Sequence, residues 1–287
     1  ITVTLLQLAK MIFKYTLHCL IIIVSQWPTG TNDVQCGRDT GIPKYHLLEK
    51  CHRSNLGIVA REYFTSLTSC QRLGIEKKAL ALNFSPPGLN LTERLEYTCE
   101  LLKCAESDGG LSLVNDTNFD YYSIYGRPLP SINSTCVPGT GMFHLSDTRM
   151  NFTQAQQACR NGSSVLADVV SEQRTDSLAQ LLAASQVESA YCGLWRDNSS
   201  GYYSANGDRL DCSMYRAWAP GHPRRRLPCV VLTRHRTWKS TSCNLTYPVL
   251  CELIPGGPYR PRSIFASRIN NGIVLSSNII KIKVVTY

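Results

Sequence analysis

The side chains best suited to chemistry in this chain are the cations between Ser213 and Ser242. This stretch contains no Asp, Glu, Asn or Gln. Its basic residues are Arg216, Arg224, Arg225, Arg226, Arg234, Arg236 and Lys239, with His222 and His235 among them. The planar guanidinium fork of arginine matches the oxygens of carboxylates, sulfates and phosphates. Two interpretations stay open: a surface for an anionic partner, such as a sulfated glycan, a sialylated glycan or an acidic protein, or a loop without a partner, solvated or cleaved as a furin-like processing site.

The first thirty residues predict secretion. Lys10 and Lys14 precede an apolar stretch at 15–24, and turn-forming residues follow, which is the order of a signal peptide over 1–30. Met11 is an alternative start. An uncleaved signal anchor over 5–24 would instead tether the protein to a membrane, but two lysines within the span oppose this. No other segment has the roughly 20 apolar residues of a transmembrane helix, so no membrane insertion is expected after signal cleavage.

Thirteen cysteines are the unusual feature of the composition. Cys19 lies in the predicted signal, and the others are Cys36, Cys51, Cys70, Cys99, Cys104, Cys136, Cys159, Cys192, Cys212, Cys229, Cys243 and Cys251. An even number in an oxidising compartment predicts six disulfides. Their spacings differ from those of zinc sites, so neither a metal nor another cofactor is expected.

Glycosylation signals agree with secretion. Asn-x-Ser/Thr occurs at Asn83, Asn90, Asn115, Asn133, Asn151, Asn161, Asn198 and Asn244. Pro86 weakens the signal at Asn83.

The net charge of +9 is concentrated at the ends of the chain. Residues 256–287 contain five basic residues, no acid and no cysteine. This basic tail is expected to be disordered, or to be readthrough of the reading frame. Because the remainder is close to neutral, a nucleic-acid partner is not expected.

Candidate catalytic residues lack a suitable sequence setting. The chain has no G-x-S-x-G, no H-E-x-x-H and no phosphate-cradling glycine loop. Cys51 and His52 could imitate a thiol–imidazole pair, but in a secreted chain we expect Cys51 to be oxidised. The sequence therefore predicts that the protein is not an enzyme.

The cysteines divide the chain into two blocks, 31–136 and 137–255, which we interpret as two domains. Tyr121–Pro130 is rich in tyrosine, glycine and proline, and is expected to be an ordered loop leading to a linker. In the second block, apolar spacing predicts a helix over 152–159 and another that opens at Ser171. Short aromatic and β-branched segments follow, at 191–195, 201–203, 229–232 and 249–252. Helices followed by short strands predict an α+β fold.

The second block resembles the C-type lectin-like domain over roughly residues 140–254. The matching residues follow the order of that family: Ala155–Cys159, Gly162, Leu166-Ala167, Ser171-Glu172-Gln173, Gly193-Leu194, Tyr203, Gly207, Trp218, Gly221-His222-Pro223, Cys229-Val230, Trp238, Cys243 and Leu250-Cys251-Glu252. The resemblance implies two helices, small antiparallel sheets, a long loop, and the disulfides Cys159–Cys251 and Cys229–Cys243. Cys192 and Cys212 are additional to the pattern, flank a hairpin-like stretch, and are predicted to pair with each other.

Members of this family that bind sugar do so through calcium, and the resemblance places their ligand motifs at His222-Pro223-Arg224 and Trp238-Lys239-Ser240. Calcium requires six to eight oxygen ligands, and these positions supply cations instead. We therefore expect no calcium-dependent sugar site. The ligand-binding candidates that remain are His222, Arg224, Arg225, Arg226, Trp238 and Lys239, and Pro223 is expected to be cis like its counterpart in the family.

The first block is expected to be a small disulfide-rich α+β domain. A helix around 65–70, a buried strand at 79–84 and the segment Cys99-Glu100-Leu101 resemble the order of a PAN/apple domain, without the central cysteine pair of that family. Cys70 is predicted to pair with Cys99, and the pairing of Cys36, Cys51, Cys104 and Cys136 stays open.

Three functions are compatible with these observations. The first is a secreted or cell-surface recognition protein that binds an extracellular protein or anionic glycan without calcium. The second is a carbohydrate-binding lectin of innate defence with a non-standard sugar site. The third is a structural component of the extracellular matrix.

Overall fold

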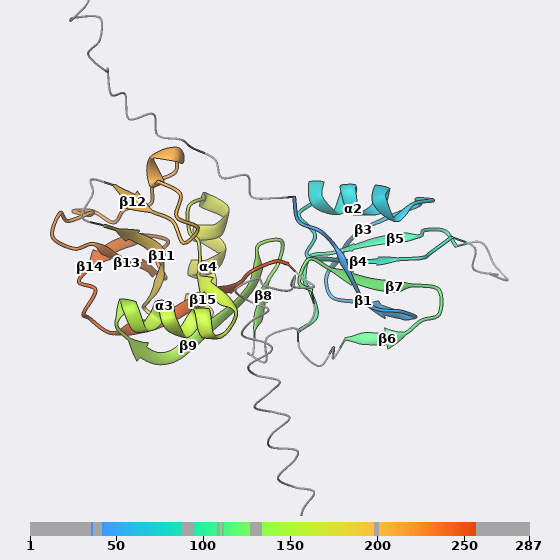
Figure 1. The fold of residues 1–287 in the computed structure, drawn as a ribbon, viewed down its shortest axis with the longest axis horizontal. Helices are drawn as coiled ribbons and strands as arrows, with labels where there is room; N and C mark the ends of the chain where they lie inside the picture. The colour runs from blue at the N-terminus through green and yellow to red at the C-terminus, as the bar shows by residue number, and fades with distance from the viewer. Residues whose placement is uncertain are drawn as a thin grey trace, which may run out of the picture. The chain divides into compact units, whose positions relative to one another are not determined.

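The computed structural model describes residues 36, 42–87, 95–107, 110, 112–126, 134–197 and 201–256 (Figure 1). Of the described residues, Cys36 belongs to a unit separate from the rest. The predicted signal peptide at 1–30 and the tail beyond residue 256 lie outside the described residues. No helix within the described ranges is long and apolar enough to cross a membrane. The division into domains at 136/137 stays a prediction.

The first half of the described chain builds a five-stranded antiparallel sheet in the order β1-β7-β4-β5-β3. A ribbon of two strands lies beside it, and helix α2 (Leu67–Glu76) packs against β4 and β5. The strands of the sheet are β1 (His46–Glu49), β3 (Ile58–Glu62), β4 (Ala81–Phe84), β5 (Cys99–Leu102) and β7 (Asp120–Ser123), and those of the ribbon are β2 (His52–Ser54) and β6 (Leu113–Asn115).

The predicted helix and strand of this half are both present. Every residue of β4 and β5 is buried, including the polar Asn83 and Glu100. Helix α2 begins after Ser66, whose hydroxyl accepts a hydrogen bond from the amide of Ser69. Its buried face carries Cys70, which forms the predicted disulfide with Cys99 of β5. The helix is therefore covalently fixed to an inner strand of the sheet.

The prediction of a loop at Tyr121–Pro130 was wrong for its first residues. Strand β7 begins at Asp120 and pairs with both β1 and β4, so it lies inside the sheet. Tyr121 is fully buried, and its hydroxyl oxygen accepts a hydrogen bond from the amide of Glu106. Tyrosine is favoured in strands. The partner strands β1 and β4 lie far from this segment in sequence, so the segment by itself does not reveal the pairing. Residues 127–130 lie outside the described ranges.

The second half builds an eight-stranded sheet along the path β14-β13-β11-β15-β9-β8, with β10 beside β15 and β12 beside β11. Strands β11 and β15 are parallel, whereas the other pairs are antiparallel. The strands are β8 (Thr135–Val137), β9 (Gly141–Met150), β10 (Ser164–Leu166), β11 (Ser189–Arg196), β12 (Tyr202–Tyr203), β13 (Cys229–Thr233), β14 (Trp238–Thr241) and β15 (Tyr247–Leu253).

Two α-helices accompany this sheet, at the predicted places. Helix α3 (Phe152–Asn161) begins with a capping box, in which Asn151 and Gln154 exchange hydrogen bonds between side chain and backbone. Helix α4 (Glu172–Ala184) begins after Ser171, whose hydroxyl accepts from the amide of Arg174. The predicted α+β class is therefore confirmed.

The cysteines of the second half form two of the three predicted disulfides. Cys159 of α3 is bonded to Cys251 of β15, and Cys229 of β13 is bonded to Cys243. The predicted Cys192–Cys212 disulfide was wrong. Cys192 points from β11 into the hydrophobic core, where it is fully buried and free, whereas Cys212 lies in the short 3₁₀ helix η1 (Leu210–Cys212) and is bonded elsewhere.

The first half also departs from the predicted cysteine chemistry. Cys104 is bonded to Cys136, and Cys36 is disulfide-bonded as well. Cys51 is free and exposed, so the expectation that it is oxidised was wrong. Because Cys51 and Cys192 are both free, six disulfides cannot form.

These two thiols should react very differently with a thiol reagent such as DTNB. Burial raises the pKa of the Cys192 thiol to about 12 and excludes reagent, whereas Cys51 is accessible. We expect Cys51→Ser to remove the fast reaction of the folded protein. We expect Cys192 to react only after the protein is denatured. Fast labelling of Cys192 in the folded Cys51→Ser variant, located by peptide mapping, would contradict the buried position of this thiol.

Candidate functional site

The arginine loop, residues 220–228, precedes β13 and is fastened to β14 by polar contacts. The amide of Arg224 donates to the hydroxyl of Ser240, at 2.8 Å, and Ser240 is buried. The amide of Leu227 donates to the carbonyl of Arg224, at 3.0 Å. The His222–Pro223 peptide bond is cis, as expected. The backbone of the loop is therefore held at several points, while Arg224, Arg225 and Arg226 are exposed.

His222 completes the attachment of this loop. Its Nδ1 accepts from the amide of Ser240, at 3.0 Å, and lies 2.9 Å from the Ser240 hydroxyl. The contact with the amide requires an unprotonated Nδ1, because an amide N–H can only donate. Burial lowers the pKa of His222, and the nearby charges of Arg224 and Lys239 lower it further, so the ring is neutral near pH 7. His222 therefore positions the loop and supplies no charge to it.

Four cations at this place are exposed and have no acidic partner within the described ranges. They are Arg224, Arg225, Arg226 and Lys239. Because like charges repel, such a group raises the local positive potential instead of cancelling it. An anion from outside the chain is the natural partner of this potential.

The other cations of the 213–242 stretch are paired, which the sequence did not reveal. Arg234 lies 2.7 Å from Glu188, and Arg236 lies 3.8 Å from Asp176. His235 contacts Glu188 as well, and Arg216 lies 3.8 Å from Asp211. All three acids come from segments before the stretch, so an inspection of 213–242 alone could not find them. The candidate surface is therefore smaller than the predicted group of seven cations.

Trp238 is not available to a ligand, and its prediction as a binding residue was wrong. Its side chain is 0% exposed. The indole N–H donates to the hydroxyl of Thr175 in α4, at 3.2 Å, and the ring meets Tyr215 and Trp218 edge to face. Trp238 and Lys239 are neighbours on one strand, so their side chains point to opposite faces. The tryptophan belongs to the core, and the lysine belongs to the surface.

Within the described ranges, no group of three or more His, Cys, Asp or Glu side chains is placed to hold a metal ion. His222 is a residue of the arginine loop whose type binds metals, but its Nδ1 accepts a hydrogen bond from the amide of Ser240. The donor chemistry of the loop therefore favours anions over cations.

The glycosylation candidates divide by exposure. Asn83 was a wrong prediction, because it is fully buried and both hydrogens of its Nδ2 are used by the Ser54 carbonyl and Glu100. Asn151 is half-buried and caps α3. The exposed candidates are Asn115, Asn161 and Asn244, and those outside the described residues are Asn90, Asn133 and Asn198.

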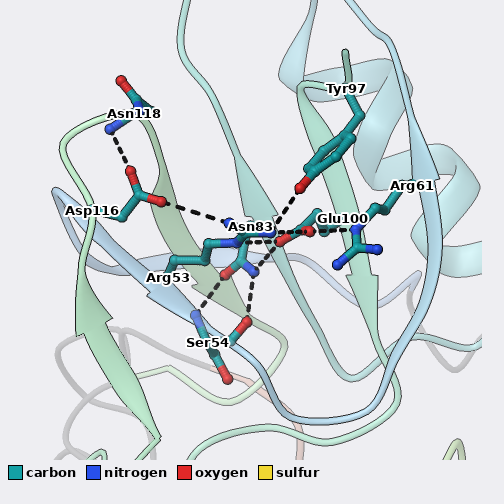
Figure 2. A network of polar contacts seen from close by, with 8 residues as sticks. All are labelled: Arg53, Ser54, Arg61, Asn83, Tyr97, Glu100, Asp116 and Asn118. Atoms are coloured by element: carbon teal, nitrogen blue, oxygen red, sulfur yellow. Dashed lines mark hydrogen bonds and ion pairs between the residues drawn. The ribbon is translucent and has the colours of Figure 1, made fainter. Parts of the chain in front are cut away.

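A second polar cluster surrounds Glu100 in the first half of the chain (Figure 2). The fully buried carboxylate accepts hydrogen bonds from Arg53 at 2.5 and 2.7 Å, and from Arg61 at 2.8 Å. Asn83 donates to it as well, at 2.9 Å. Burial by itself raises the pKa of Glu100, but the donors more than offset this, so the pKa lies below its usual value.

Arg53 makes further contacts beyond Glu100. It donates to the hydroxyl of Tyr97, at 2.9 Å, and lies 3.8 Å from Asp116. Its guanidinium carbon lies 5.0 Å from the centre of the Phe119 ring, in a cation–π contact. Because the buried groups satisfy one another, we assign the cluster to stability. The sequence missed it because its members come from β2, β3, β4 and β5.

The Cys51–His52 pair is not arranged as a nucleophile and its base. Nδ1 of His52 lies 2.7 Å from the carbonyl of Lys50, so the ring is engaged with the backbone. The amide of Cys51 donates to Asp120. Neither contact activates the thiol.

Comparison with known proteins gives a family match for the second half of the chain. A family model described as the lectin C-type domain matches residues 148–253. Among solved structures, human lithostathine is 21% identical, covering 41% of this chain and 94% of its own, with a TM-score of 0.36. The carbohydrate-recognition domain of cow CD23 is 20% identical, covering 41% and 91% of the two chains, with the same TM-score. The lectin CEL-I of Cucumaria echinata is 18% identical, covering 40% and 91%, again at 0.36.

No curated protein matches the chain. Domains of this family are in general binding modules and not enzymes. The disulfides and the lectin-like fold indicate an extracellular protein with a recognition role. The family match, the paired helices and the disulfides Cys159–Cys251 and Cys229–Cys243 lead to one conclusion: residues 148–253 form a C-type lectin-like domain.

Proposed function

We propose that this chain is a secreted recognition protein whose C-type lectin-like domain binds an anionic partner, a protein or a glycan, without calcium. The observation that carries the proposal is the exposed, unpaired arginine run Arg224–Arg226 beside Lys239. This run lies where the resemblance to the family places its calcium ligands. Guanidinium groups there favour anions and oppose a divalent cation.

The surroundings of the arginine loop support the same assignment. Acids neutralise Arg234, Arg236 and Arg216, but within the described ranges none approaches Arg224, Arg225 or Arg226. Hydrogen bonds to Ser240 hold the loop backbone before any partner arrives. A surface that is already ordered loses less conformational entropy on binding, which favours affinity. The same electrostatic field should steer anionic partners toward the loop.

The test is a binding screen against glycans and extracellular proteins, with the secreted, glycosylated protein in EDTA and in calcium. We expect anionic partners to bind equally in both conditions, and binding to weaken as salt is added. Binding that requires calcium would favour the alternative of a carbohydrate-binding lectin. Stable self-association without any ligand would favour a structural role.

Calcium should leave the thermal stability of the protein unchanged. An ion stabilises a protein only by binding its folded state, and the exposed cations of the arginine loop repel Ca²⁺. We expect equal melting temperatures in millimolar calcium and in EDTA. A rise of several degrees with calcium would contradict this and would point to Asp208 and Asp211, the acids that precede the stretch, as ligands.

A further inference from the structure

The unpaired cations of the arginine loop continue onto β14. The amide of Arg224 donates to Ser240, next to Lys239 on that strand. The charges of Arg224 and Lys239 both lower the pKa of His222, so both lie near this ring. We name Arg224, Arg225, Arg226 and Lys239 the basic strip.

The strip carries more positive charge than a single acidic group can satisfy. Its four cations are exposed and have no acidic partner in the described ranges. One carboxylate or one sulfate reaches two guanidinium groups at most when the contact is bidentate. The strip therefore fits a partner that carries several anionic groups along its length.

The surface around the strip lacks what a protein partner would use as an anchor. Protein interfaces are dominated by large apolar or aromatic side chains that enter pockets of the partner. In the described part of the chain, the exposed large hydrophobic residues nearest in sequence are Met214 and Leu245, and none lies between them. Trp218 and Tyr202 pack against each other, with centroids 4.9 Å apart, and are only partly exposed. Charge, and not apolar contact, is what this surface offers.

Arginine is suited to sulfate because its planar donor fork meets two oxygens of the anion at once, and three of the four cations of the strip are arginines. The same fork also meets carboxylates, so the experiment compares the two kinds of anion. His222 stays neutral because Ser240 occupies its Nδ1, so the strip does not depend on the protonation of histidine. Binding should then persist throughout the neutral range.

We propose that the basic strip binds a linear glycan that carries repeated sulfate groups. This inference rests on the proposed function, because it names the class of anionic partner for the same surface. An acidic protein remains the competing partner, and the experiment separates the two.

The experiment measures the affinity of the intact secreted protein for four probes in EDTA: heparin, hyaluronan, polysialic acid and poly-glutamate. Heparin carries repeated sulfates, whereas the other three carry carboxylates alone. We expect heparin to bind at least tenfold more tightly than the others, with an affinity that falls as sodium chloride is raised.

Two variants with the same change of charge locate the contact. R225A/R226A removes two unpaired cations of the strip, and R234A/R236A removes two exposed cations that Glu188 and Asp176 already neutralise. We expect the first variant to weaken heparin binding at least tenfold and the second to change it less than threefold. Melting temperatures of both variants check that the fold is retained.

The outcomes distinguish failure of this inference from failure of the proposed function. Tight binding of poly-glutamate or polysialic acid without preference for heparin would overturn the sulfated partner and leave anion recognition intact. Equal losses in the two variants would show that net charge, and not the strip, holds heparin, and would overturn the inference. Binding of no probe at low salt would overturn both.

Discussion

Glu100→Ala is expected to lower the free energy of unfolding by about 3–5 kcal/mol, because it leaves the charge of Arg53 buried without its partner. The side chain of Arg53 is 20% exposed, and that of Glu100 is 0% exposed. Urea denaturation measures the loss. Glu62→Ala is the matched control, since Glu62 lies on the neighbouring strand β3 but is exposed. A loss for Glu100→Ala below 1 kcal/mol would mean that the cluster in Figure 2 adds little to stability.

The same carboxylate should make the protein sensitive to acid. The pKa of Glu100 is lowered in the folded protein, so its contribution is complete above the pKa of the unfolded chain and is lost as pH falls through the folded pKa. Glu252 works in the opposite direction, because burial raises its pKa against the effect of Arg174. Glu100→Gln keeps the shape and removes the titration. We expect it to flatten the decline of stability between about pH 5 and 2, and an unchanged decline would exclude Glu100 as its source.

Removal of the Cys159–Cys251 disulfide is the second change with a large expected effect. This bond closes a loop with a sequence separation of 92, whereas Cys229–Cys243 closes one of 14. The loop-entropy relation gives about 4–5 kcal/mol for the longer loop and about 3 kcal/mol for the shorter. Double replacement by serine, followed by urea denaturation, compares the two directly. A larger loss for Cys229→Ser/Cys243→Ser would show that native packing, and not loop closure, decides the difference.

The sequence predicts the parts of this fold that depend on local order. The apolar spacing of Phe152, Ala155 and Cys159 marks α3, and Ser171 marks the beginning of α4, because caps and helical periodicity act over a few residues. The disulfides of the lectin-like domain follow from the family resemblance. These features needed no knowledge of distant partners.

The features that the sequence does not predict depend on contacts between distant segments. Glu188 and Asp176 neutralise Arg234 and Arg236 from positions about fifty residues earlier, so the sequence overstates the charge of the candidate site. Trp238 follows a family motif but turns into the core beside Thr175. Cys192 enters the core as a small apolar side chain, a role that a count of cysteines does not distinguish from a disulfide.

The position of β15 constrains how the protein is made. This last described strand lies within the sheet, where it pairs with β9, β10 and β11. A ribosome synthesises Cys251 after every other described cysteine, so Cys159 waits for its partner while the thiol of Cys192 is already present in the nascent chain. Co-translational oxidation can therefore join the wrong pair during this interval. Once β15 is in place, the core encloses Cys192, and its thiol can no longer take part in thiol–disulfide exchange.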